Sequence, residues 1–482
     1  MCNSEEKKSF YITTTLPYVN ARPHIGFAME VVRADAIARY HRLKGSDVFF
    51  NTGTDEHGQK IADKAAELGK TPQEYVNEMS LHFKELEKML SISPNRFIRT
   101  TDEDHVTAAQ AFWKLCDEKG YIYKKSYKGM YCVGDEMFMK EKDLADGRCP
   151  NHPNQELIEI EEENYFFAFS KLENQLKQKI SEEGFIAPNY RTKEMLQMID
   201  DGLEDFSISR LKEKVSWGVP VPGDDKQVMY VWFDALVNYV STVGWPSSME
   251  QFNAFWTNAQ TVQICGKDNT QHQALRWQAM LLAAGLKTTD TIIVNGFLVS
   301  DGQKMSKSLG NVIDPQDIVD VFGTDGLRYF VLRELHPHED SDVTKEKITE
   351  AYNANLANGI GNLTNRILKM AEDNLDAIPE FSKHTTAEFP EYEQAFESFN
   401  IQKAADFVWK KVGDLDQLIQ DTQPFKVVKE HPEKAKEIIK NLVVELYAIA
   451  FLLQPLLPTT AKKLKKCVEA MKKPEEPLFQ RI

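Results

Sequence analysis

The stretch Ser9-Phe10-Tyr11-Ile12-Thr13-Thr14-Thr15-Leu16-Pro17-Tyr18-Val19-Asn20, with Pro23-His24-Ile25-Gly26-Phe27 shortly after it, decides the fold class of this chain. Residues 9–16 are mostly β-branched or aromatic, which predicts a buried strand, and residues 17–20 predict a turn. Residues 25–43 predict a helix that stops at Gly45. A second strand at 47–52 and a second helix at 54–68 complete a β-α-β-α order, which is typical of a parallel sheet with right-handed crossovers.

This alternation stops between about residues 120 and 210, where short strand-like pieces and one helix near 170–181 are expected. It returns in a part of the chain with strands at 227–233, 261–265 and 291–294 and a helix at 272–284. From about residue 345 the pattern is almost entirely helical, with long helical periods at 350–373, 393–420 and 434–454. We therefore expect an α/β fold in which a Rossmann-like parallel sheet is split by an inserted domain and followed by an α-helical bundle.

The expected domain boundaries follow from these changes of pattern. The two halves of the parallel-sheet domain take residues 1–119 and 211–325, and the insertion takes 120–210. Residues 326–350 form a linking stem, and residues 351–482 form the helical bundle. Because open parallel sheets bind ligands at the carboxyl ends of their strands, we expect the functional site at that edge.

Composition limits the partners and the compartment. The chain has 482 residues, 42% of them hydrophobic, and a net charge of −15, so indiscriminate binding to nucleic acid or anionic membranes is not expected. Six dispersed cysteines and an N-terminus without an apolar signal segment favour the cytoplasm. The apolar run 442–457 contains Glu445 and Gln454, so we expect a buried bundle helix and no membrane span.

Two short motifs carry the chemistry. Lys304-Met305-Ser306-Lys307-Ser308 puts two ammonium groups three residues apart on a polar loop, which can close over a triphosphate as pyrophosphate leaves. Near the start of the chain, His24 and Gly26 stand at a helix N-terminus, where the helix dipole and an imidazole N–H both favour phosphate. Taken alone, each motif also fits an ordinary solvated loop or helix start.

Together and in this order, the two motifs resemble those of class I aminoacyl-tRNA synthetases. Further segments look like the methionyl-tRNA synthetase family, and the match runs from about residue 9 to about residue 460: these segments are 15–20, 53–58, 230–235, 266–268 and 358–363. The resemblance implies that ATP, with Mg²⁺, converts L-methionine to methionyl-adenylate, and that the methionyl group then passes to the 3′ end of tRNA(Met). Catalysis would consist of positioning and charge stabilisation, without a covalent enzyme intermediate.

The resemblance also assigns residues to ATP. The catalytic group would be His24, Gly26, Lys304 and Lys307. The ATP-binding set would add Phe27, Glu30, Gly266, Lys267 and Asp268. The alternative for the last two is an ion pair within a loop.

A methionine pocket needs a carboxylate for the ammonium group and an apolar, polarisable wall for the thioether. Asp55 fits the first role by resemblance, although it could also cap a helix. The remaining pocket residues implied by the resemblance, whose aromatic members could instead belong to the core, are Leu16, Tyr18, Trp232, Ala235, Leu236, Tyr239 and Gln273.

The chain departs from the family pattern at four positions. Phe27 and Gln273 stand where a histidine is usual, and Asn295 stands where a histidine is frequent. Phe425 replaces a usual tryptophan. Gln and Asn still donate hydrogen bonds, whereas Phe27 removes one phosphate donor.

The insertion contains a candidate zinc knuckle. Cys132-x2-Asp135 is followed after thirteen residues by Cys149-x2-His152, and zinc accepts thiolate, imidazole and carboxylate ligands in a tetrahedral site. The alternative is a metal-free hairpin pair with two free thiols.

The helical part would read the anticodon, by resemblance through Asn362 and Arg366, which are four residues apart, and through Phe425, which could stack a base. A helix cap or an interhelical hydrogen bond is the alternative for Asn362 and Arg366. The chain stops near Ile482 without the appended dimerisation module of some relatives, so a monomer is expected.

Two other functions remain open on the sequence. The substitution at Phe27 would suit a weakened paralogue that only binds tRNA or nucleotides, although the intact Lys-Met-Ser-Lys-Ser motif and Asp55 oppose this. A class I synthetase for another amino acid, such as cysteine or leucine, is opposed by Trp232 and Tyr239.

Overall fold

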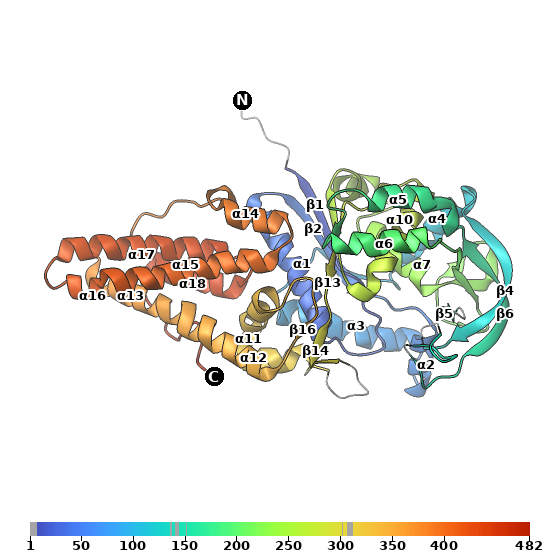
Figure 1. The fold of residues 1–482 in the computed structure, drawn as a ribbon, viewed down its shortest axis with the longest axis horizontal. Coiled ribbons are helices and arrows are strands. Elements are labelled where there is room, and N and C mark those ends of the chain that lie inside the picture. Colours follow the sequence, from blue (N-terminus) through green and yellow to red (C-terminus); the bar gives the residue numbers. More distant parts are fainter. Residues whose placement is uncertain (1–6, 135–136, 140–143, 151, 301, 306–311) are drawn as a thin grey trace, which may run out of the picture.

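The structure is a computed structural model that describes residues 7–134, 137–139, 144–150, 152–300, 302–305 and 312–482. The molecule is elongated, with a helical bundle at one end and a β-hairpin domain at the other (Figure 1). The central sheet lies between them. The expected α/β fold with a helical C-terminal part is confirmed.

Six parallel strands form the central sheet, in the order β3-β2-β1-β12-β13-β7. They are β1 (Ser9–Thr13), β2 (Asp47–Thr54), β3 (Arg96–Arg99), β7 (Ile186–Ala187), β12 (Gln260–Gly266) and β13 (Thr291–Asn295). The helices that connect or cover them are α1 (Ile25–Lys44), α2 (Gln59–Glu67), α3 (Pro72–Met89), α4 (Glu103–Glu118), α5 (Glu173–Ile180), α6 (Tyr190–Asp200), the π-helix η5 (His272–Trp277) and α10 (Gln278–Ala284).

Local sequence explains where the first helix begins and ends. His24 caps the N-terminus of α1 through its side chain, and Gly45 ends the helix in the left-handed conformation at φ 98°. The expected helix is therefore confirmed. The helix expected at 54–68 starts later, at Gln59, because β2 continues to Thr54 and a loop follows it.

Two expectations about the strands are wrong in detail. Residues 227–233 do not form one strand of the parallel sheet: β11 (Asp224–Met229) lies in a small antiparallel sheet, and α7 (Val231–Leu236) follows. A short apolar run has no periodicity that separates strand from helix. Within the insertion, β7 pairs in parallel with β13, so part of residues 120–210 belongs to the central sheet.

The rest of the insertion is an antiparallel sheet in the order β5-β4-β6-β8. Its long hairpin forms the end of the molecule opposite the bundle (Figure 1). Its strands are β4 (Ile122–Cys132), β5 (Met137–Met139), β6 (Ile158–Phe167) and β8 (Phe206–Ser207). Two further small sheets have the orders β10-β11-β9 and β15-β14-β16, and their strands are β9 (Ser209–Leu211), β10 (Pro220–Val221), β11, β14 (Leu298–Ser300), β15 (Gln303–Lys304) and β16 (Ser341–Asp342).

The C-terminal part is helical, as expected. The single helix expected at 393–420 is instead two helices, α14 (Pro390–Glu397) and α15 (Ile401–Thr422). Helical geometry is interrupted between them at Phe399, whose φ is 57°. The run 442–457 is mostly buried in the bundle, and none of the described helices is long and apolar enough to cross a bilayer. The main helices are α11 (Pro315–Tyr329), α12 (Lys345–Ala351), α13 (Asn362–Asn374), α14, α15, α16 (Pro424–Val427), α17 (Pro432–Leu452) and α18 (Pro458–Ala470).

A buried ion pair joins the sheet domain to the bundle. Asp35 of α1 lies 2.8 Å from Nη1 of Arg328 on α11, and both side chains are fully buried. The same guanidinium donates to the carbonyls of Pro455 and Leu456 in the α17–α18 turn, at 3.0 and 2.8 Å. One charged group therefore fixes three elements that are far apart in sequence.

We expect Arg328→Met to destabilise the protein by about 3–5 kcal/mol, because it leaves the Asp35 carboxylate buried without its main cationic partner. Arg39→Met is the matched control, since Arg39 binds the same carboxylate at 2.7 Å but is partly exposed. It should cost about 1 kcal/mol or less. The shift of the denaturant midpoint measures both, and equal shifts would contradict the role of the buried pair.

Candidate active site

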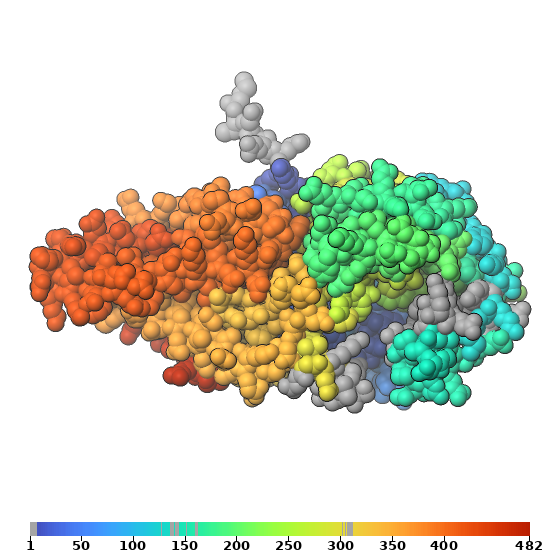
Figure 2. Space-filling view, viewed as in Figure 1, coloured from blue at the N-terminus to red at the C-terminus, as the bar shows by residue number. Residues whose placement is uncertain are grey.

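A cavity of about 1020 Å³ opens at the carboxyl ends of the central strands. On the face drawn in Figure 2, the surface is hollowed between the green and teal parts of the chain, with the blue N-terminal part on its floor. Apart from Lys267, every expected ATP or methionine residue whose side chain the structure describes lines this cavity: Leu16, Tyr18, His24, Gly26, Phe27, Glu30, Asp55, Trp232, Ala235, Leu236, Tyr239, Gly266, Asp268 and Gln273.

His24 is oriented by its own helix. Its Nδ1 accepts a hydrogen bond from the Gly26 N–H at 3.0 Å, so in the neutral ring the proton sits on Nε2. A Cβ at position 26 would lie 2.9 Å from the His24 ring, and only glycine leaves this contact relaxed. The arrangement holds an exposed N–H donor at a helix N-terminus, which suits phosphate.

The His24–Gly26 motif and the described part of the lysine motif at 304–308 meet at this cavity. Met305, from the second motif, lines it together with His24. The backbone N–H of Ile25 also donates to the carbonyl of Ile313, just beyond that motif, at 3.1 Å. Ser306, Lys307 and Ser308 lie outside the described residues, as does the side chain of Lys304, so their contacts remain predictions.

Lys267 differs from the expected phosphate ligand. Its ammonium lies 2.7 Å from each carboxylate oxygen of Asp340 and 4.3 Å from the ring centre of Phe297. Lys267 therefore forms an ion pair, but its partner is Asp340, 73 residues away, and not a residue of its own loop. Its neighbours Gly266 and Asp268 line the cavity.

Asp55, the carboxylate expected for the methionine ammonium group, is only 7% exposed. Its backbone pairs with the turn after β1: the Asp55 N–H donates to Pro17 at 3.0 Å, and its carbonyl accepts from Val19 at 3.2 Å. The helix-cap alternative is wrong, because Gly58 occupies the N-cap of α2. Asp55 is thus held at the cavity wall by its main chain.

Aromatic residues line another part of the same cavity. Trp232 stacks on His272 with ring centres 3.8 Å apart, and the Gln273 amide donates to the Tyr239 hydroxyl at 2.7 Å. Burial, followed by the nearby charge of Arg276, lowers the pKa of His272 well below its usual value, so this ring is neutral. Gln273, which stands where a histidine is usual in the family pattern, directly follows His272, and His272 packs on Trp232.

Sequence reasoning missed the function of Arg33. Its buried guanidinium donates to the Asn295 side chain at 2.8 Å and to the carbonyls of four residues, Val331, Leu335, His336 and Pro337, at 2.9–3.3 Å. Asn295 lines the cavity. An arginine within the apolar face of the helix at 25–43 was the available signal, because such a residue is buried only when it is paired.

Sequence reasoning also missed a buried network around Asp234. The Asp234 carboxylate lies 2.6 Å from Nδ1 of His57 and 2.9 Å from Nε2 of His105. Burial alone would raise the pKa of Asp234, but the charges and hydrogen bonds of the two histidines outweigh it and lower the pKa to about 2. The signal was an aspartate within the otherwise apolar run 230–236.

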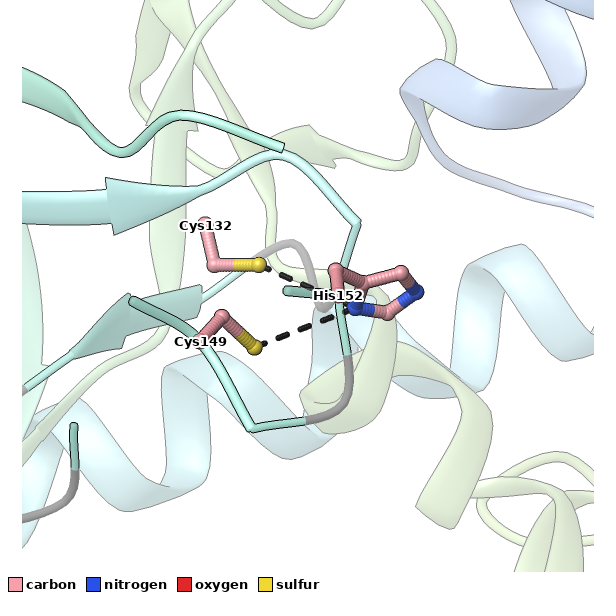
Figure 3. Close-up of side chains that lie close together, drawn as sticks. All are labelled: Cys132, Cys149 and His152. Atoms are coloured by element: carbon pink, nitrogen blue, oxygen red, sulfur yellow. Dashed lines mark hydrogen bonds between the residues drawn. The ribbon is translucent and has the colours of Figure 1, made fainter. Parts of the chain in front are cut away.

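Three side chains of the expected metal knuckle come together (Figure 3). The Nδ1 atom of His152 lies 3.8 Å from the Cys132 sulfur and 3.9 Å from the Cys149 sulfur, and these ligand atoms all lie within 4.8 Å of one another. Such spacing suits the edges of a tetrahedral zinc site. Asp135, the fourth expected ligand, lies outside the described residues.

Comparison with known proteins decides the family. A model for tRNA synthetases class I (M) matches residues 10–157 and 154–368, and one for the anticodon binding domain of methionyl tRNA ligase matches residues 372–477. The methionine–tRNA ligase of Thermotoga maritima is 38% identical over 97% of this chain and 76% of its own length. The methionine–tRNA ligase of Nostoc sp. is 38% identical over 96% of this chain and 90% of its own length. The chain belongs to the methionine–tRNA ligase family of class I aminoacyl-tRNA synthetases.

Solved structures agree with this methionine–tRNA ligase assignment. Methionyl-tRNA synthetase of Mycobacterium tuberculosis in complex with methionyl-adenylate matches with a TM-score of 0.89 at 34% identity, over 98% of this chain and all of that one. Its apo form matches with a TM-score of 0.83 at 31% identity, over 99% of both chains. Membership of this family excludes the synthetases for cysteine or leucine.

The expected anticodon-reading residues lie on two helices, and of the three only Phe425 falls within residues 372–477, which match the anticodon binding domain. Asn362 is exposed at the start of α13, and Arg366 forms an ion pair with Asp416 of α15. Phe425 is 50% exposed on α16, at the end of the bundle farthest from the sheet (Figure 1). The interhelical alternative therefore holds for Arg366, while Phe425 presents an unusually exposed ring.

Glu30 supports the cavity wall from α1. Both the backbone N–H and the hydroxyl of Thr15 donate to its carboxylate at 2.7 Å. Burial, partly offset by these hydrogen bonds, raises its pKa from the ordinary 4.5 to about 8. Between these values the folded state binds more protons than the unfolded state, so this group makes the protein less stable as pH rises.

We expect Glu30→Gln to remove this dependence while keeping an acceptor for Thr15. The stability of the variant relative to the parent protein should therefore increase between pH 5 and pH 8, by at most about 1.4 kcal/mol per pH unit, and level off above. Denaturant unfolding at a series of pH values measures the difference. A difference that stays constant with pH would show that Glu30 is ionised throughout.

Proposed function

We propose that this chain is an active methionine–tRNA ligase that joins L-methionine to ATP and transfers the methionyl group to the 3′ end of tRNA(Met). The observation that carries the proposal is the shared cavity: the histidine-capped start of α1, Met305 of the second motif and the Asp55–Trp232 pocket all line it. A nucleotide and an amino acid can therefore meet in one enclosed space. We further propose that the enzyme acts in the cytoplasm as a monomer.

In the first step, Asp55 would bind the ammonium group of methionine, while Trp232 and Tyr239 contact the thioether. The methionine carboxylate would attack the α-phosphorus of ATP, forming the acyl–phosphate bond and breaking the bond to the bridging oxygen of pyrophosphate. The His24 Nε2–H and the positive end of α1 would stabilise the charged phosphates. Lys304 and Lys307, with Mg²⁺ on the triphosphate, would neutralise the departing pyrophosphate.

Phe27 does not contribute a phosphate donor. Its ring packs edge-to-face on Phe83, with ring centres 5.6 Å apart, and is almost fully buried. Charge stabilisation would rest on His24, the helix start and the two lysines. A paralogue that only binds tRNA or nucleotides would not need Asp55 to be held at the cavity wall or His24 to be oriented by its helix. The geometry therefore favours an active enzyme.

For tRNA, Asn362 and Phe425 are both accessible, and Phe425 lies within the residues that match the family's anticodon-binding domain. An exposed aromatic ring can stack an unpaired base, at about 1–3 kcal/mol per base. We propose that these residues, with Arg366 held by Asp416, contact the anticodon.

Methionine-dependent exchange of radioactive pyrophosphate into ATP tests the proposal without tRNA. We expect exchange by the parent protein, a loss of about 100-fold or more in Lys307→Ala, and a raised KM for methionine in Asp55→Asn at a nearly unchanged KM for ATP. A folded parent protein that supports no exchange with methionine would leave only the binding function.

We also propose that Cys132, Cys149 and His152 hold a structural Zn²⁺ ion, with Asp135 as the fourth ligand. The donor set and the sulfur–nitrogen spacing fit the ion. A substitution at Gly134 would disturb this ligand geometry, because a Cβ there would lie 2.3 Å from the His152 ring.

We expect about one zinc ion per parent chain and markedly less in Gly134→Ala, because His152 must move away from the sulfurs. Gly413→Ala is the matched control, since a Cβ at Gly413 meets nothing within 4 Å. Elemental analysis of the purified proteins measures both. A folded parent protein without zinc would remove the proposal.

A further inference from the structure

The proposed methionine pocket has two walls that come from distant parts of the sequence. One wall is the loop after β2, which contributes Asp55. The other is α7 and the residues beside it, which contribute Trp232, Ala235 and Leu236. Because the pocket must recognise an ammonium group and a thioether at once, the separation of the walls sets which side chain fits.

A single hydrogen-bonded pair lies behind both walls. Asp234 sits on α7 among the lining residues but is fully buried and does not line the cavity. His57 follows Asp55 by two residues, and its Nδ1 lies 2.6 Å from the Asp234 carboxylate. This contact spans 177 residues of sequence and ties the Asp55 loop directly to α7.

The carboxylate is anchored on its other side as well. Its second oxygen lies 2.9 Å from Nε2 of His105 on α4, and Nδ1 of His105 lies 2.9 Å from the Ser241 hydroxyl. An ionised carboxylate only accepts hydrogen bonds, so both histidines donate to it. Hydrogen bonds to a charged group in a buried setting are short and strong.

The Asp55 loop is also held by Trp217. The indole N–H donates to the Glu56 carbonyl at 2.7 Å, and the Gly58 N–H donates to the Trp217 carbonyl at 2.9 Å. The His57 ring also packs against the indole, with centres 5.5 Å apart. The bond between His57 and Asp234 is a direct side-chain link from this loop to α7.

We propose that His57 and Asp234 are positioning residues that fix the separation of the Asp55 wall from the α7 wall, and thereby the affinity and size selectivity for methionine. This inference rests on the proposed function. His105 has a different role: its two ring nitrogens bind Asp234 and Ser241, so its hydrogen bonds anchor Asp234 to α4 and not to the Asp55 loop. His57 and His105, which bind the same Asp234 carboxylate, can therefore be substituted as test and control.

The test uses pyrophosphate exchange with methionine and with its S-ethyl homologue. His57→Leu removes the hydrogen bond, and His57→Asn restores a donor at the position of Nδ1. We expect His57→Leu to raise the KM for methionine about tenfold and to reduce discrimination against the homologue, with the KM for ATP changed less than about twofold. His57→Asn should recover most of the loss.

His105→Leu serves as the control, because it removes another buried partner of the same carboxylate. We expect it to lower the thermal midpoint at least as much as His57→Leu, yet to keep the KM for methionine within about twofold of the parent. Equal KM changes in the two leucine variants, no change in either, or no recovery in His57→Asn would overturn the proposal. The parent protein's own exchange activity separately decides the proposed function.

Discussion

The site depends on one geometric constraint, the shared direction of four parallel strands. Because β1, β2, β12 and β13 run the same way, the residues that follow them reach the same edge of the sheet. These are the turn that leads to His24, the Asp55 loop, the Gly266–Asp268 segment and Asn295. Reversal of any one strand would carry its residues to the far edge, about 17–20 Å away for a strand of ordinary length.

Buried charged groups hold the elements around this edge in place. Arg33 joins α1 to Asn295 and to the chain beyond α11, Arg328 joins α1 to the bundle, and Asp234 joins the Asp55 loop to α7. Each charge is satisfied by partners from at least two other segments. Since an unpaired buried charge is costly, these links are specific, and each permits only one relative placement of the parts it joins.

Much of the fold could be predicted because it is encoded locally. The strand at 9–13, the capped helix α1 and the helices of the bundle follow from side-chain periodicity, from His24 and from Gly45. Residues 227–233 could not be assigned from periodicity, because a short apolar run fits strand and helix equally. The short strand β7 also escaped prediction: two residues carry no period, and only pairing with β13 makes them a strand.

The sequence by itself predicted many of the residues that line the cavity, because contiguous motifs that resemble those of the family are visible without the fold. Only the tertiary structure decided how those residues are held. It put Lys267 on Asp340 and joined His57 to Asp234, across 73 and 177 residues. A hydrogen bond between distant segments leaves no periodic trace in either of them, since its existence depends on where the whole chain brings the two side chains.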